Sequence, residues 1–144
     1  MNYLAHLLLS GPDRDVQVGG LLGDFVKGPL RNDFPASIEL GIELHRRLDT
    51  YTDRHEAFVA ATACLPPPWR RYRGIVLDIY FDHLLARHWQ NFHPQPLEDF
   101  CAGFYRHLKR HRPLLPPRAL HFSRVAPRVG WLESYRSEHR LPLM

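Results

Sequence analysis

Prolines divide this sequence into short segments, and within most of them the apolar residues recur at helical spacing. The 13 prolines gather between these segments, where they act as helix breakers. Strand signals are nearly absent, since no alternating run of Val, Ile or Thr reaches a useful length and no Asn-Gly turn occurs. The sequence therefore predicts an all-α fold of several helices in one compact domain.

The breakers also predict where the helices begin and end. We expect helices over about residues 2–10, 16–27, 33–51, 53–64, 69–92 and 98–110, a proline loop at 113–117, and one or two short helices ending near residue 136. The second helix contains Gly19, Gly20 and Gly23, although each glycine in a helix costs about 1 kcal/mol relative to alanine. We expect these glycines to let another helix approach closely.

Length and cysteine content limit the kind of protein. A chain of 144 residues fits one domain. A domain of this length buries about two-thirds of its unfolded surface, which is enough for a hydrophobic core without disulfide or metal cross-links. Cys64 and Cys101 lie far apart and form no CxxC motif, which excludes a disulfide scaffold and a thiolate zinc site. No window approaches the roughly 20 apolar residues of a membrane span, and no signal-like segment occurs. We therefore expect a cytoplasmic protein without a membrane partner.

Charge is unevenly distributed along the chain. Residues 1–100 carry ten basic and 13 acidic residues, whereas residues 101–144 carry nine basic and two acidic ones. The basic segment could attract an acidic protein or another polyanion, or it could be only a solvated surface.

Acidic residues and histidines that recur at helical spacing are the candidate functional residues of this sequence. His45, Asp49 and Asp53 are four residues apart, so they share one face of a helix, with Arg46 and Arg47 beside them. Aspartate is a poor helix former, so two aspartates inside a helical pattern favour a functional role over a solvated stripe.

A second segment carries acids on an apolar helix. Asp78 and Asp82 are also four residues apart, and buried carboxylates are unfavourable unless they are paired or bound to a metal. Structural pairing of these carboxylates with arginine is the alternative to metal binding. The adjacent Asp82 and His83 suit a divalent metal with oxygen and imidazole ligands. Asp24 is likewise a lone acid in an apolar run, whereas a lone His6 on an apolar face is more often a core residue.

Other chemistries fit poorly. The sequence has no P-loop, no GxSxG and no HExxH motif. Aromatic residues alternate with arginine at 105–106 and 121–124, which could stack on single-stranded nucleic acid, but this spacing is common in helices. We therefore expect no nucleic-acid partner.

Several motifs in one order resemble the acyl-carrier-protein phosphodiesterases, or holo-ACP hydrolases. The motifs are NYLAHL at 2–7, GDF at 23–25, HRRLDTYTD at 45–53, DIYFDH at 78–83 and Trp89. The resemblance implies an all-helical fold related to the HD-domain phosphohydrolases. It also implies a Mn²⁺-dependent phosphodiesterase of fatty acid and lipid metabolism that removes 4′-phosphopantetheine from holo-ACP, leaving apo-ACP.

The residues and the resemblance together predict a site. We expect a metal shell of His6, Asp24, His45, Asp49, Asp82 and His83, holding Mn²⁺ or another divalent ion such as Mg²⁺ or Fe²⁺. Arg46 or Arg47 would bind the phosphate and neutralise charge that develops on it. Asp53 and Asp78 would act in catalysis by orienting ligands or buffering Arg46. The dyad reads Asp-His, the reverse of the usual HD order, so ligand roles cannot be transferred from the wider superfamily.

The basic segment then has an expected partner. Arg106, Lys109, Arg110 and Arg112 would attract holo-ACP, an acidic carrier protein, and this steering should weaken with salt. The family usually continues with at least one more helix, so we expect the closing helix to be truncated after about Arg136. Such a loss could expose an apolar surface that a homodimer would cover.

Two alternatives stay open at this point. One is an HD-like metal phosphohydrolase that acts on a nucleotide or another small phosphodiester. The other is an inactive relative that still binds ACP, against which the complete set of His and Asp residues argues.

Overall fold

Residues 1–138 are described by the computed structural model, and within them every regular element is helical. The α-helices are α1 (Tyr3–Leu9), α2 (Arg14–Leu22), α3 (Ala36–Arg54), α4 (Glu56–Ala63), α5 (Arg73–Arg87), α6 (Leu97–Arg110) and α7 (Pro117–Val129). Short 3₁₀ turns are η1 (Pro67–Tyr72), η2 (Trp89–Asn91), η3 (Arg112–Leu114) and η4 (Glu133–Arg136). The all-α prediction is confirmed. The expected truncation of a closing helix after about Arg136 stays a prediction, and residues 139–144 lie outside the described residues.

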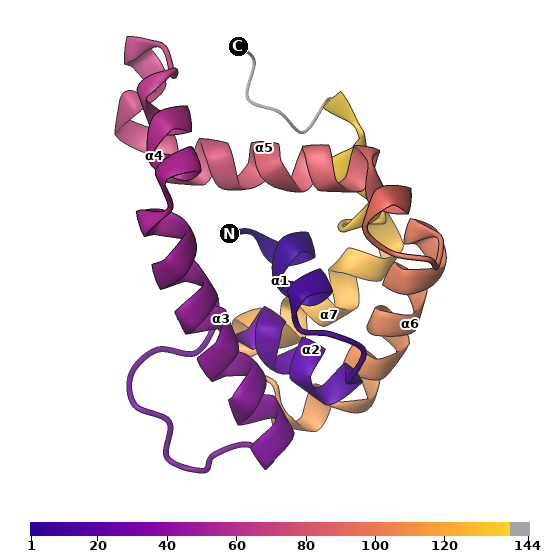
Figure 1. Ribbon diagram of the computed structural model, residues 1–144. Helices are drawn as coiled ribbons and strands as arrows, with labels where there is room; N and C mark the ends of the chain where they lie inside the picture. Colours follow the sequence, from indigo (N-terminus) through magenta and orange to yellow (C-terminus); the bar gives the residue numbers. More distant parts are fainter. Residues whose placement is uncertain (139–144) are drawn as a thin grey trace.

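Helices α1 and α2 lie in the middle of the fold. Figure 1 shows α3 along one side of them, α5 across the top, and α6 and α7 on the other side. The core between these helices contains Leu4, Leu21, Ile42, Phe104 and Phe122. A smaller second cluster joins α4 to α5 at the protruding upper corner of Figure 1.

Several helix boundaries differ from the predicted ones: α3 and α4 begin about three residues later than predicted, and three further differences have a clear physical reason. The second helix ends at Leu22 rather than at residue 27, because the chain turns at Gly23 and Asp24 with short-range bonds back to Leu21 and Leu22. The predicted helix over 69–92 is split into η1, α5 and η2, since the chain turns at His88 and brings Trp89 into the core. Pro117 begins α7 rather than ending a loop, because proline fits the first helical turn.

Glycines bring α2 and α3 into close contact, as predicted for Gly19. A Cβ atom on Gly19 would lie 2.1 Å from the carbonyl oxygen of Ile38 on α3. Gly41 of α3 faces it, and a Cβ atom there would lie 2.1 Å from the carbonyl oxygen of Val16. This crossing places the middle of α3 against the end of α2, where a Cβ atom on Gly23 would meet the His45 ring at 2.1 Å.

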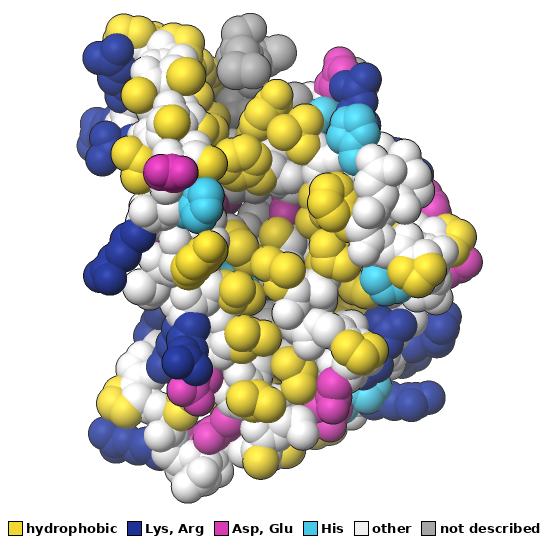
Figure 2. Space-filling view, viewed as in Figure 1, with side chains coloured by type: hydrophobic (Ala, Val, Ile, Leu, Met, Phe, Trp, Pro, Cys, Tyr) yellow, Lys and Arg dark blue, Asp and Glu magenta, His cyan; other side chains and the backbone are white. Residues whose placement is uncertain are grey.

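Hydrophobic side chains gather over the middle of one face of the molecule, whereas Lys and Arg lie mainly at its edges (Figure 2). Ile75 and Phe81 of α5 and Phe92 after η2 are exposed. The homodimer that could cover such residues stays a prediction. No helix in the described part of the chain has the length and apolar character needed to cross a membrane. Cys64 and Cys101 are both free, as expected.

Candidate metal centre

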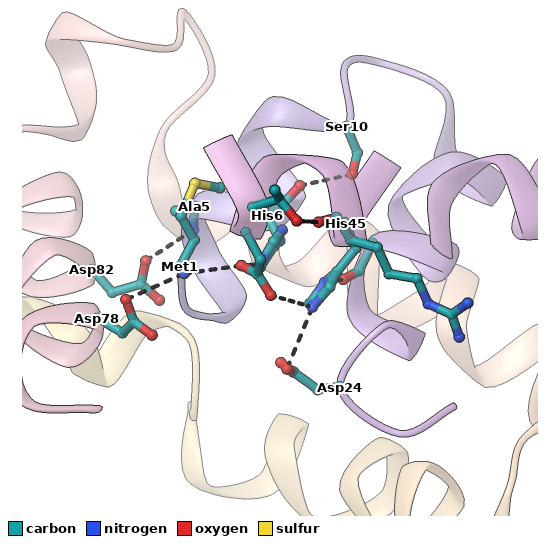
Figure 3. Close-up of polar contacts among 12 residues, drawn as sticks. Met1, Ala5, His6, Ser10, Asp24, His45, Asp78 and Asp82 are labelled. Carbon is teal, nitrogen blue, oxygen red and sulfur yellow. Dashed lines mark hydrogen bonds and ion pairs between the residues drawn. The ribbon is translucent and has the colours of Figure 1, made fainter. Parts of the chain in front are cut away.

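Four of the predicted ligands come together around Asp49. The carboxylate of Asp49 on α3 lies 2.9 Å from His6 Nε2 on α1 and 3.2 Å from His45 Nε2, one turn earlier on α3. Asp24, in the turn after α2, lies 3.4 Å from His45 Nε2. Figure 3 shows the side chains of His6, His45 and Asp24 pointing toward one another from three parts of the chain.

His45 is held in one orientation and one tautomer. Its Nδ1 lies 2.6 Å from the carbonyl oxygen of Gly20, and because a carbonyl only accepts, Nδ1 carries the proton. Its Nε2 therefore faces the carboxylates of Asp24 and Asp49. Burial lowers the pKa of His45, but the bonds to Asp24, Asp49 and the Gly20 carbonyl raise it to about 9. The arrangement requires a cation between Nε2 and the two carboxylates, either a proton or a metal ion.

His6 is the second imidazole of the centre. Its ring is buried and stacks on His45 with the ring centroids 3.5 Å apart. Burial lowers the pKa of His6, which favours the neutral ring that binds metals. Its Nδ1 is a buried nitrogen without a hydrogen-bond partner. The sequence alone favoured a core role for His6, and the structure places it in the core and at the site together.

Asp49 is the charged member at the centre of the group. Burial raises its pKa, but the bonds from His45 and His6 outweigh that effect and hold it below the ordinary value. Asp49 is therefore ionised, as a metal ligand must be. The ligand atoms of His6, His45 and Asp49 lie within 4.8 Å of one another, so these three residues could hold a metal ion.

Asp78 faces the same region from α5. The amino group of Met1 lies 3.0 Å from Asp49 Oδ1 and 3.2 Å from Asp78 Oδ1, so it links the two carboxylates. Burial raises the pKa of Asp78, and the nearby charges of Asp49 and Asp53 add to this effect. Asp53 itself is exposed near the end of α3.

A cavity of about 410 Å³ opens beside Asp24 and Asp78. Its aromatic lining comes from Tyr3, Trp131 and Tyr135. No sequence pattern predicted that these aromatic residues would line the site. Tyr3 lies inside the NYLAHL motif, so the motif could have pointed to it. No local sequence pattern indicates that residues 131 and 135 lie beside the same cavity.

Asp82 and His83 are outside the group of His6, His45 and Asp49 that could hold an ion, and both make contacts that join distant elements of the fold. Asp82 is buried on α5 and accepts hydrogen bonds from the backbone N–H groups of Leu4 at 2.8 Å and Ala5 at 2.9 Å. These bonds satisfy the first turn of α1. Burial raises the pKa of Asp82 to about 7, although the two N–H bonds lower it. His83 Nδ1 pairs with the carbonyl oxygen of Tyr135 at 2.8 Å and so fastens η4 to α5.

Asp82→Ala should therefore destabilise the fold more than it weakens metal binding. We expect a loss of about 3 kcal/mol, because two buried N–H groups lose a charged acceptor. Asp82→Asn keeps one carbonyl acceptor and should lose about half as much. Thermal unfolding and Mn²⁺ titration of both variants check this. A stable Asp82→Ala chain that has lost its metal would instead make Asp82 a ligand.

The predicted phosphate-binding arginines lie on another face of α3. Arg46 Nη2 donates to the carbonyl oxygen of Val26 at 3.2 Å. Arg46 and Arg47 line a separate open cavity of about 830 Å³ together with Tyr51 and Arg54. The structure does not bring either arginine to the His6, His45 and Asp49 cluster.

The predicted carrier-binding residues divide into two groups. Arg106, Lys109 and Arg110 are exposed on α6. Arg112 is half-buried and donates to the hydroxyl and carbonyl oxygens of Ser123, so it fastens η3 to α7.

Comparison with known proteins shows the family of this chain, which the geometry of the site does not show by itself. The family described as acyl carrier protein phosphodiesterase matches residues 1–142. The chain belongs to this family. Relatives named acyl carrier protein phosphodiesterase come from Klebsiella pneumoniae, 37% identical over 94% of this chain and 71% of the relative, and Serratia proteamaculans, 38% identical over 94% and 70%. One from Escherichia coli is 35% identical over 94% and 71%.

Membership confirms the resemblance found in the motifs. The family name denotes phosphoric diester hydrolases. No solved structure matches the chain significantly, so the relation to HD-domain phosphohydrolases stays a prediction.

Proposed function

We propose that this chain is a metal-dependent phosphodiesterase that hydrolyses holo-acyl carrier protein to apo-ACP and 4′-phosphopantetheine. The observation that carries the proposal is the contact of two imidazoles, His6 and His45, with the Asp49 carboxylate, a group that could hold a metal cation, with Asp24 beside His45, in a member of this family. Phosphodiester hydrolysis is a reaction in which such a bound cation is directly useful.

The donor set fits a transition metal better than Mg²⁺. His6 and His45 offer nitrogen, and Asp24 and Asp49 offer oxygen, a mixture that suits Mn²⁺ or Fe²⁺. Mg²⁺ prefers oxygen ligands and retained water. The bond from His45 Nδ1 to the Gly20 carbonyl is also the usual way in which a metal-binding histidine is oriented.

The residues of this chain would prepare the reaction as follows. His6, His45 and Asp49, with Asp24 beside them, would hold a divalent ion, which would lower the pKa of a water molecule and polarise a phosphoryl oxygen. Asp49 keeps both imidazoles turned toward one point, and Gly20 fixes the His45 tautomer. The cavity lined by Tyr3, Trp131 and Tyr135 would hold the pantetheine arm and exclude bulk water beside Asp24. Hydrolysis joins the water oxygen to phosphorus and breaks the bond from phosphorus to the serine oxygen of ACP.

Intact-mass spectrometry tests this proposal. Holo-ACP is incubated with the chain after removal of metal by a chelator, with and without added Mn²⁺, and a panel of nucleotide phosphodiesters is treated in parallel. We expect ACP to lose the phosphopantetheine mass only when Mn²⁺ is present. Turnover of nucleotides without turnover of holo-ACP would favour the small-phosphodiester alternative. Binding of holo-ACP without turnover would favour an inactive relative, and full turnover without metal would contradict metal dependence.

Recognition of the acidic carrier protein by α6 gives a second expected result. Reversing charge at Arg106, Lys109 and Arg110 to Glu should raise KM for holo-ACP about tenfold and flatten its salt dependence, because steering depends on screened charge. The matched control reverses Arg70, Arg71 and Arg73, which are equally numerous and exposed around η1. Steady-state kinetics at several salt concentrations measure both sets. Equal effects from the two sets would show that only net charge matters, and a larger effect from the control set would move the docking surface to η1.

A further inference from the structure

A second group of metal-binding side chains lies away from the His6 cluster, where α2 packs against α6. Asp15 is in the first turn of α2, and His107 and His111 are four residues apart in the last turn of α6 and at its end. Asp15 Oδ1 lies 2.6 Å from His107 Nε2 and 3.2 Å from His111 Nε2. Both imidazoles therefore point at the same carboxylate oxygen.

The tautomer of His111 makes this convergence unusual. Its Nδ1 lies 3.0 Å from the carbonyl oxygen of His107, and because a carbonyl only accepts, Nδ1 carries the proton. In the neutral ring Nε2 then presents a lone pair to a carboxylate that also presents lone pairs. A cation between them removes this repulsion. That cation is either a proton or a metal ion, and the His107 ring, with its centroid 4.6 Å from that of His111, brings a second nitrogen that a metal ion would use.

We propose that Asp15, His107 and His111 form a second divalent-metal site, of the kind that binds Zn²⁺, which ties the start of α2 to the end of α6. With bonds of about 2.0–2.2 Å, tetrahedral zinc ligands lie roughly 3.3 Å apart. The three ligand atoms already lie within 4.8 Å of one another, so small side-chain adjustments bring them into place.

The exposure of the site agrees with a three-residue zinc centre. The side chains of Asp15, His107 and His111 keep 39%, 21% and 18% of their surface exposed, so the fourth position opens to water. Zn²⁺ binds nitrogen-containing sites more tightly than Mn²⁺, so the second site should prefer Zn²⁺ where both ions are present. The hydrogen bond from His111 Nδ1 to the His107 carbonyl supports the ligand as histidine ligands are usually supported.

Calorimetric titration of the metal-free full chain with Zn²⁺ tests the proposal. We expect His111→Ala and His107→Ala to weaken one class of Zn²⁺ site by roughly 100-fold or more, at or above the upper end of the 10–100-fold that loss of a supporting bond causes at metal sites. Metal-free His111→Gln provides a second variant of similar size in case alanine disturbs the fold. His121→Ala, an exposed histidine on α7, is the matched control and should bind as the unchanged chain does.

Two further measurements separate this site from the His6 cluster. Zn²⁺ should still raise the thermal unfolding temperature of an Asp49→Asn chain, and that rise should vanish when His111→Gln is added. Turnover of holo-ACP in Mn²⁺ should be the same in His107→Ala and in the unchanged chain. Unaltered Zn²⁺ stoichiometry in both histidine variants, or no Zn²⁺ binding in Asp49→Asn, would overturn the proposal.

Discussion

Asp49→Asn is expected to abolish turnover of holo-ACP and to remove the bound Mn²⁺. Both imidazoles of the centre contact the Asp49 carboxylate, and these contacts stabilise its ionised form. A catalytic metal contributes several kcal/mol to transition-state stabilisation, so we expect kcat/KM to fall by about 10³-fold or more. Mass spectrometry of ACP and Mn²⁺ titration measure the two effects.

The control for this variant lies on the same helix. Glu43→Gln removes the same charge from α3 at an exposed position two residues before His45. It should leave both turnover and Mn²⁺ binding within about twofold, as surface changes usually do. An Asp49→Asn chain that keeps its metal and its turnover would remove Asp49 from the centre.

The second large effect is on stability and comes from Gly41→Ala. The new methyl group would lie 2.1 Å from the carbonyl oxygen of Val16 and 2.8 Å from the Cα atom of Gly19. Both contacts are backbone atoms, so α2 and α3 must separate. We expect a loss of about 3 kcal/mol in the free energy of unfolding, which lowers the melting temperature by roughly 10 °C.

Gly74→Ala is the matched control for helix propensity. Gly74 is in the first turn of α5, and nothing lies within 4 Å of the added methyl group. This change should raise stability by up to about 1 kcal/mol, because alanine is the better helix former. Thermal unfolding followed by circular dichroism compares the two variants. If Gly41→Ala were as stable as Gly74→Ala, the crossing of α2 and α3 would not depend on the glycine contact.

The part of the site that lies on one helix could be predicted from sequence. His45 and Asp49 are four residues apart on α3, and helical periodicity alone places them together. The prediction that Gly19 admits a neighbouring helix was also within reach, since glycine in a helix interior is unfavourable without such a reason. The helices themselves followed from the prolines and the apolar spacing.

Residues whose partners are distant in sequence could not be assigned in this way. Asp82 has the spacing expected of a ligand, but it accepts bonds from the start of α1, 77 and 78 residues earlier. Arg46 has the right neighbours in sequence, but it bonds to the carbonyl of Val26. Asp15 lies 92 residues from His107, and no local pattern joins them. Spacing shows which face a side chain is on but not what the rest of the chain brings to that face.

Anomalous diffraction at the manganese edge, from crystals of the full chain grown with Mn²⁺, tests the metal centre most directly. We predict a strong anomalous peak between His6 Nε2, His45 Nε2 and the Asp49 carboxylate, with Asp24 close enough to contribute an oxygen. A peak beside Asp82 and His83 with none at Asp49 would contradict this placement. The placement would also be contradicted if those crystals hydrolysed holo-ACP while their only manganese ion lay elsewhere.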